Sequence, residues 1–147
     1  VICFEPIPKI YEVLQKNLES YNNVELHNLG LSNYAQTAKF QMTKIKCGVS
    51  FQVDEYENNP EYENFECKLV TLDSYNFDQV DWIKVDVEGF EMAVLEGSKE
   101  TLKRNRPWLL LEDNENSKQH REFLNDVCGP YEPAQVKSKT NTIWIPQ

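Results

Sequence analysis

The chain has 147 residues, of which 40% are hydrophobic and 27% charged, and its formal net charge is −9. A chain of this length suits one domain with a sizeable core. The negative charge excludes a general binder of nucleic-acid backbones, because phosphate binding depends on Lys and Arg. No apolar stretch approaches the roughly 18 residues of a membrane span, so we expect a soluble protein that binds small molecules or neutral surfaces.

The first 31 residues predict a strand, a helix and a second strand. Residues 1–5, VICFE, form a short apolar run typical of a buried strand. Pro6 and Pro8 suit a strand-to-helix turn, and apolar residues then recur at helical spacing as far as residue 21. Residues 24–31, VELHNLGL, favour another strand. This order predicts a parallel pair of strands with a right-handed crossover.

The signal is weaker over residues 36–72. TAKFQM and CKLVTL favour strands, and the acidic segment 54–66 between them favours a surface loop. The pattern then strengthens. We expect strands at DWIKVDV and PWLLLED, one helix over 88–105, a second helix over 117–127 that Asn116 or Ser117 could cap, and a hairpin of YEPAQV with NTIWIP.

Strands alternate with helices through most of the chain. This order favours an α/β fold with an open, doubly wound and mostly parallel sheet, closed by an antiparallel C-terminal hairpin. Ligands bind such sheets beyond the carboxyl ends of the strands.

Acidic residues stand at the predicted ends of three strands. They are Glu5, Asp86 and the pair Glu112 and Asp113. Parallel strands would gather these carboxylates at one edge of the sheet. Glu5 in particular could accept hydrogen bonds from the hydroxyls of a ribose, although a charge at the start of the following helix would explain it equally well.

Three carboxylates surround the start of the helix predicted from residue 88. Asp86 ends the strand and would point into the crevice, where it could orient a ligand or accept a proton. Glu91 fits a first-turn helix charge, and Glu88 fits either role. Gly89 would let the backbone approach a ligand closely, whereas Lys84, within the strand, fits a structural lysine.

Metal ligands are sparse. Asp86, Asp113 and Asn114 offer three oxygen ligands of the kind that Mg²⁺ accepts, but turn chemistry alone explains EDNEN. Four scattered cysteines and two histidines give no zinc motif. Scattered cysteines also favour a reduced, cytoplasmic chain.

Several segments together resemble the FkbM family of S-adenosylmethionine-dependent methyltransferases. In chain order they are VICFEPIPKIYEVLQKNL, VELHNLGLSN, VTLDSY, DWIKVDVEGFEMAVLEGSKETL and RPWLLLED. The resemblance implies a class I methyltransferase fold of the Rossmann-like kind. It also implies methylation of a hydroxyl oxygen on a sugar, another glycan or a small metabolite.

The resemblance also implies roles for single residues. Glu5, with Pro6, would hold the ribose of S-adenosylmethionine, and Asn28, Leu29 and Gly30 would flank its adenine. The residues implied beside the methyl group and the acceptor are Asp86, which also contacts the cofactor, Glu88 and Glu112. Asp86 or Glu88 would orient the acceptor hydroxyl and take its proton during in-line transfer.

The chain departs from the family pattern at its beginning. Family members carry a strand, a Gly-containing turn and a helix before FEP, and this strand lies between those that start here at Val1 and Asp81. We therefore expect residues 1–147 to be one partial methyltransferase domain with two unpaired strand edges.

Two other interpretations stay open at this point. One is a noncatalytic α/β binding or assembly module derived from a methyltransferase scaffold. The other is a magnesium-dependent, catechol-type transferase that uses Asp86, Asp113 and Asn114. The sequence does not name the methyl acceptor, because acceptor pockets are built from loops.

Overall fold

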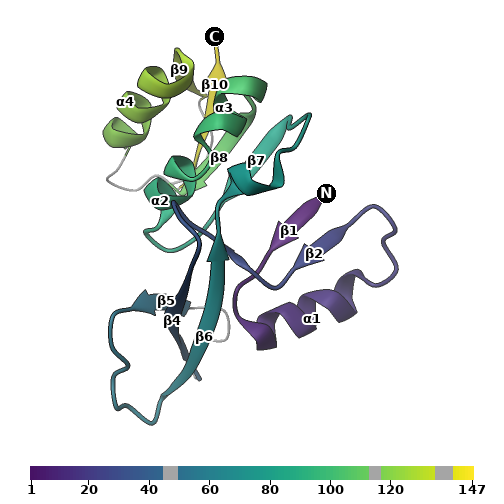
Figure 1. The fold of residues 1–147 in the computed structure, drawn as a ribbon, viewed down its shortest axis with the longest axis vertical. Helices are drawn as coiled ribbons and strands as arrows, with labels where there is room; N and C mark the ends of the chain where they lie inside the picture. The colour runs from purple at the N-terminus through teal and green to yellow at the C-terminus, as the bar shows by residue number, and fades with distance from the viewer. Residues whose placement is uncertain (45–49, 113–116, 135–140) are drawn as a thin grey trace. The chain divides into compact units, whose positions relative to one another are not determined.

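The structure is a computed structural model that describes residues 1–44, 50–112, 117–134 and 141–147. The chain divides into two compact units, Val1–Val70 and Thr71–Gln147, and each is described by itself. Figure 1 shows the elements of both along the chain. No helix in the described ranges is long and apolar enough to cross a membrane.

The first unit begins with the expected strand, helix and strand. Strand β1 (Ile2–Phe4) and strand β2 (Glu25–His27) pair in parallel, and helix α1 (Pro8–Leu18) connects them. Pro8 occupies the first turn of α1, where its missing N–H would have no partner in any helix. The helix ends at Leu18, so the predicted extension to Tyr21 is wrong by one turn. Both the parallel pairing and the connecting helix are confirmed.

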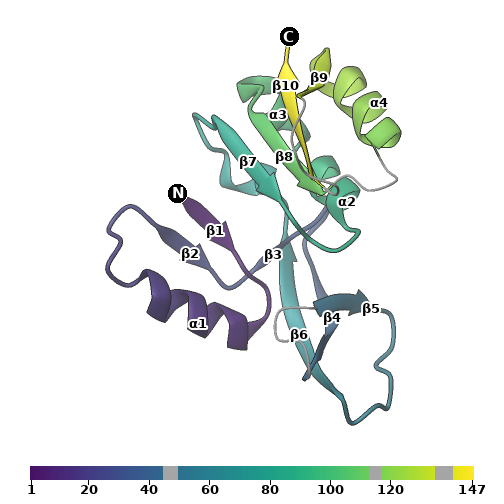
Figure 2. The ribbon, with the colours of Figure 1, turned by 180° about the vertical axis from the view of Figure 1, so that it is seen from behind.

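A second sheet of the first unit is mixed in direction and follows the order β3-β6-β4-β5 (Figure 2). Its strands are β3 (Gly30–Leu31), β4 (Gln36–Thr43), β5 (Ser50–Val53) and β6 (Tyr62–Val70). The strand predicted over 24–31 is therefore two strands in two sheets. The acidic loop predicted over 54–66 is also shorter than expected, because β6 begins at Tyr62.

A small apolar cluster supports this sheet. Ile7, which precedes α1, packs with Met42 of β4 and Cys67 of β6, and all three side chains are buried. Ile10, Phe40 and Phe65 pack around them. The cluster fixes the beginning of α1, and hence the end of β1, against the second sheet.

The second unit contains a four-stranded sheet with the order β7-β8-β10-β9. Its strands are β7 (Trp82–Val85), β8 (Trp108–Glu112), β9 (Tyr131–Ala134) and β10 (Asn141–Pro146). Strands β7 and β8 are parallel, whereas β10 is antiparallel to both of its neighbours. The predicted C-terminal hairpin is confirmed, and its second strand lies between β8 and β9.

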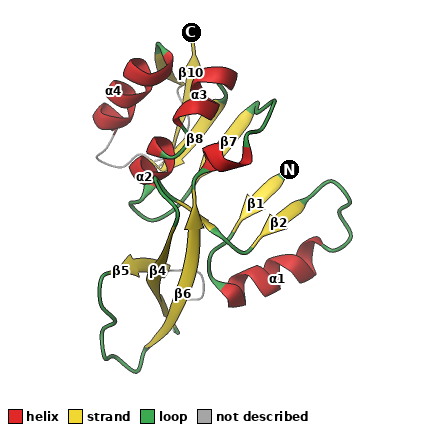
Figure 3. Ribbon diagram, viewed as in Figure 1, coloured by secondary structure: helices red, strands yellow, loops and turns green. Residues whose placement is uncertain are grey.

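The helices of this unit follow the prediction with one correction. The single helix expected over 88–105 is two helices, α2 (Glu91–Glu96) and α3 (Lys99–Asn105) (Figure 3). The buried Ser98 hydroxyl donates to the carbonyl of Val94 at 2.6 Å, which satisfies an acceptor at the end of α2. The short helix η1 (Leu72–Tyr75) supplies a cap for α3, and helix α4 is Ser117–Cys128. The cap proposed at Asn116 lies outside the described residues.

The described residues thus form a mixed α/β fold in three sheets, where one continuous sheet was expected. Within the described ranges, β1 pairs only with β2, and β7 pairs only with β8. Buried leucines and aromatic residues of the second unit, among them Leu109, Leu111 and Trp144, form one face of its sheet. The placement of helices on both faces of a single sheet stays a prediction.

Candidate functional site

Glu5 lies directly after β1 in the first unit. Its backbone N–H donates to the carbonyl of His27 at 3.0 Å, which extends the parallel ladder by one residue. Its side chain turns toward the start of α1, where Oε1 accepts the N–H of Ile7 at 2.7 Å. Burial raises the pKa of the Glu5 carboxyl, and the Ile7 hydrogen bond opposes part of this rise. Among the described residues, Oε2 of Glu5 accepts no hydrogen bond.

Four other residues predicted to contact the cofactor lie near Glu5 in the first unit. The Asn28 side-chain amide donates to the carbonyls of Glu5 and Pro6 at 2.9 and 3.2 Å, which ties the turn after β2 to the turn after β1. Gly30 is buried against Pro6, and a Cβ on it would lie 2.5 Å from Cδ2 of Leu69. Leu29, between them, is half-buried. The structure therefore brings five of the six residues predicted to contact the cofactor together in the first unit, whereas the sixth, Asp86, belongs to the second unit.

Asp86 and Glu112 follow corresponding positions of neighbouring strands in the second unit. Val85 of β7 is the register partner of Leu111 of β8. Asp86 follows Val85, and Glu112 follows Leu111. Side chains alternate along a strand, which places the two carboxylates on the same face. Neighbouring strands are roughly 5 Å apart. Both acids therefore stand side by side at the carboxyl edge of this sheet. The prediction that Glu5 and Asp113 share the same edge is not confirmed, because Glu5 follows a strand of a different sheet and Asp113 lies outside the described residues.

Lys84 has a partner that the sequence analysis missed. Its Nζ lies 2.7 Å from Oδ2 of Asp86, and both side chains are largely exposed. The two residues are separated by two positions on a strand, so alternation puts them on one face. The two-residue spacing of Lys84 and Asp86 in the sequence could therefore have predicted this ion pair. The pair fixes one oxygen of Asp86, although an exposed ion pair of this kind contributes little to stability.

A tight turn joins β7 to α2 and carries Glu88. Glu88 and Gly89 both have positive φ values, 50° and 92°, and the N–H of Phe90 donates to the carbonyl of Val87 at 3.4 Å. Two consecutive positive φ values are those of a type I′ turn. A left-handed Glu costs about 1 kcal/mol or more. Glu88 is exposed, and in the described part of the chain it makes no hydrogen bond or ion pair.

The structure does not describe Asp113 and Asn114, the other ligands of the suggested magnesium site. Among the residues that it does describe, no group of three His, Cys, Asp or Glu side chains is placed to hold a metal ion. Of the three suggested magnesium ligands, the structure describes Asp86.

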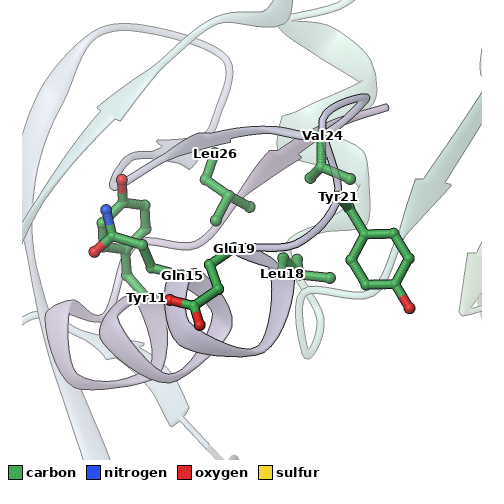
Figure 4. Close-up of a pocket in the computed structure, with 7 residues that line it drawn as sticks. All are labelled: Tyr11, Gln15, Leu18, Glu19, Tyr21, Val24 and Leu26. Carbon is green, nitrogen blue, oxygen red and sulfur yellow. The ribbon is translucent and has the colours of Figure 1, made fainter.

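A pocket of the first unit does not coincide with the predicted site. Figure 4 shows a pocket of about 380 Å³ between α1 and β2, lined by Tyr11, Leu18, Tyr21 and Leu26 among others. Tyr21 and the neighbouring Val24 precede β2, so the pocket lies toward the amino end of that strand. Asn28 and Gly30 follow its carboxyl end. A second hollow of about 430 Å³, between α4 and the C-terminal hairpin, includes none of the predicted residues.

Comparison with known proteins identifies the family. The fold is mixed α/β, with Glu5 after a parallel strand of the first unit and Asp86 and Glu112 at the ends of two parallel strands of the second. Residues 1–129 match the family model described as the methyltransferase FkbM domain. The chain therefore belongs to the FkbM methyltransferase family, which confirms the resemblance seen in its motifs.

A solved structure shares the fold. The crystal structure of methyltransferase FkbM from Methylobacillus flagellatus KT aligns with a TM-score of 0.67 and 16% sequence identity. The alignment covers 98% of this chain and 35% of that chain, so this chain spans about a third of the length of the similar protein. The comparison with curated proteins gave no match.

Proposed function

We propose that this chain carries cofactor-binding and catalytic segments of an S-adenosylmethionine-dependent O-methyltransferase. The proposed acceptor is a hydroxyl group of a sugar or another small metabolite. One observation carries the proposal. In this chain of the FkbM family, Asp86 and Glu112 stand next to each other at the carboxyl ends of neighbouring parallel strands. Ligands of α/β sheets bind at that edge.

The surroundings of Glu5 fit the ribose of the cofactor. One carboxylate oxygen is held by Ile7, while the other accepts no hydrogen bond from the described residues and can accept one from a ribose hydroxyl. Asn28 keeps the two strand ends together, and Gly30 lets Pro6 pack closely against the turn. Asn28, Leu29 and Gly30 would then flank the adenine. S-adenosylmethionine supplies an electrophilic methyl group when it is bound.

The acids of the second unit would divide the chemistry on the acceptor. Lys84 already occupies one oxygen of Asp86, so Asp86 suits a role in orienting the acceptor hydroxyl. Glu88 is exposed and has no partner in the described chain, so it suits the role of proton acceptor. Glu112 would hold a second hydroxyl of the acceptor. Glu88 would accept the proton that the acceptor hydroxyl loses as its oxygen takes up the methyl group.

The sheet of the second unit supports a doubly wound arrangement as part of this proposal. Trp82 and Trp108 are register partners on the face opposite the buried leucines, and their rings lie 5.1 Å apart. They are 52% and 41% exposed. Parallel strands that are apolar on both faces are typical of sheets covered by helices on both sides. We infer that a helical layer covers this face as well.

Calorimetry with S-adenosylhomocysteine tests the proposal. The chain spans only part of its structural relative, so the titration should use this chain and any longer form that its gene encodes. We expect binding that Glu5→Ala abolishes and that Glu12→Ala, an exposed change on α1, leaves intact. Transfer of a labelled methyl group to a panel of sugars and small alcohols would then identify the acceptor.

Two results would contradict the proposal. The first is an absence of binding in every natural form of the protein. The second is methyl transfer that survives Asp86→Asn and Glu88→Gln together, because the proposed chemistry leaves no other proton acceptor beside the hydroxyl. Methyl transfer that requires added Mg²⁺, and that stops with a chelator, would favour a metal-assisted reaction over this one.

A further inference from the structure

Glu91 differs from the acids around it in its burial. It is the first residue of α2 and only 2% exposed, whereas Asp86 and Glu88 are exposed. An ordinary first-turn helix charge lies in solvent and interacts with the helix dipole from there. A buried carboxylate needs hydrogen bonds to offset the loss of water. Glu91 accepts one from the backbone N–H of Gly89, at 3.2 Å from its Oε1.

That bond acts on the turn that presents Glu88. A non-glycine residue in the left-handed region persists only where the surrounding structure holds it. The backbone hydrogen bond that closes the turn, from Phe90 to Val87, is long at 3.4 Å. A Cβ on Gly89 would meet no atom within 4 Å, so no neighbouring group packs against the turn at that point. The bond to Glu91 is therefore a main restraint on the turn.

Glu91 is itself held by a rigid element. Val94 and Leu95 of the same helix are 2% and 1% exposed, which anchors α2 in the core of the second unit. The Phe90 carbonyl accepts the N–H of Val94 at 3.1 Å, so the end of the turn is joined to the first turn of α2. Because α2 is anchored in the core, Glu91 holds Gly89, and with it Glu88, in a fixed position relative to that core.

We propose that Glu91 is a positioning residue that locks the Glu88–Gly89 turn and fixes where the Glu88 carboxylate points. This inference rests on the proposed methyl transfer, in which Glu88 accepts the proton. Glu91 does not touch the reacting atoms. Its contribution is geometric, because a base displaced by about 1 Å loses as much as a hundredfold in rate.

Two substitutions of Glu91 distinguish the contribution of its hydrogen bond from that of its side-chain size. Glu91→Met keeps the length of the side chain and removes the acceptor, while Glu91→Gln keeps an oxygen that can accept the Gly89 N–H. The control is Glu96→Met, an exposed position on the same helix. Amide exchange at Gly89, the affinity for S-adenosylhomocysteine, and kcat and KM for the acceptor are measured for each variant of the full chain.

We expect Glu91→Met to speed amide exchange at Gly89 about tenfold or more and to lower kcat about ten- to a hundredfold. The affinity for S-adenosylhomocysteine should not change, because Glu5 and its neighbours are untouched. Glu91→Gln should restore the protection of Gly89 and most of kcat, and Glu96→Met should behave like the unaltered protein. Unchanged exchange at Gly89 in Glu91→Met, or a Gln variant as impaired as the Met variant, would overturn the inference.

Gly89→Ala provides a second route if Glu91→Met fails to fold. The added methyl group meets no neighbour but disfavours the φ of 92°, so it disturbs the turn while leaving Glu91 in place. It should lower kcat without changing the affinity for S-adenosylhomocysteine, and an unchanged kcat would contradict the role given to the turn. If no form of the protein transfers methyl groups, the proposed function fails, whereas the exchange comparison still decides whether Glu91 holds Gly89.

Discussion

Asp73 contacts Thr101 and thereby caps helix α3, which begins 26 residues after it in the chain. Oδ1 of Asp73 accepts both the backbone N–H of Thr101, at 2.8 Å, and its hydroxyl, at 2.7 Å. Oδ2 accepts the N–H of Glu100 at 3.0 Å. These amides belong to the first turn of α3, which has no partner for them within the helix. The VTLDSY segment thus serves the structure as a cap supplied from a distant part of the chain.

Replacing Asp73 should therefore destabilise the second unit. We expect Asp73→Ala to lower the free energy of unfolding by about 1–2 kcal/mol, because it removes a helix cap and leaves the buried Thr101 hydroxyl without its acceptor. Urea denaturation followed by circular dichroism measures the change. Asp78→Ala, at an exposed position nearby, is the matched control and should shift the midpoint little. Equal effects of the two substitutions would show that the cap contributes nothing.

Replacing Gly30 with alanine should destabilise the first unit. In Gly30→Ala the new Cβ would lie 2.5 Å from Cδ2 of Leu69 and 3.2 Å from Cβ of Pro6. Overpacking of this kind costs about 1–3 kcal/mol. Leu69→Val removes the clashing δ carbon, so the double variant should be more stable than the sum of the two single changes predicts. Additive losses in thermal or urea unfolding would mean that the clash is relieved in another way.

The sequence predicted the elements whose signals are local. Pro8 at the start of α1, the apolar run of β8 and the turn-separated strands of the hairpin all depend on nearby residues, and the structure contains each of them. The division of residues 88–105 into two helices depends instead on Asp73, which no local pattern connects to α3. The same limit explains β3, because the pairing of Gly30 and Leu31 with β6 is set by residues almost 40 positions away.

In the candidate site, too, some features could be predicted from local sequence patterns and others could not. The strand ends that carry Glu5, Asp86 and Glu112 followed from the alternation of strands and helices, because parallel strands end at one edge. The burial of Glu91 did not follow, since a first-turn acid is normally exposed. Glu91 also follows a left-handed turn at Glu88 and Gly89, which EGFE alone does not specify. Asp113 and Asn114 lie outside the described residues, so their predicted role is untested.

Cys67 should be inert toward thiol reagents while the protein is folded. Its side chain is 2% exposed, and burial together with the nearby Glu5 carboxylate raises the pKa of the thiol to about 11. At pH 7 about one thiol in ten thousand would be ionised. In a variant whose other three cysteines are serine, labelling should proceed only through unfolding and should accelerate sharply in urea. Labelling in buffer as fast as that of a variant that keeps only the half-exposed Cys3 would contradict this expectation.

Glu5 should weaken the fold at neutral pH. Burial raises its pKa above the ordinary value of 4.5, so the native state holds this proton more tightly than the unfolded chain does. The stability due to Glu5 is therefore greatest below pH 4.5 and is lost as the pH rises through the raised native pKa. Glu5→Gln keeps an oxygen for the Ile7 N–H but carries no charge. It should raise the urea midpoint at pH 7, and this gain should vanish as the pH approaches 4.

The same substitution should reduce binding at the proposed ribose site. Replacing a charged acceptor with a neutral one removes a charge-assisted hydrogen bond, so the affinity for S-adenosylhomocysteine should fall about ten- to a hundredfold. Glu12→Gln, on the exposed side of α1, should change neither the midpoint nor the affinity. A stabilised variant with weaker binding is the pattern of a residue kept for function. A destabilised variant at pH 7 would instead assign Glu5 to the packing of the first unit, with its carboxylate needed for the fold.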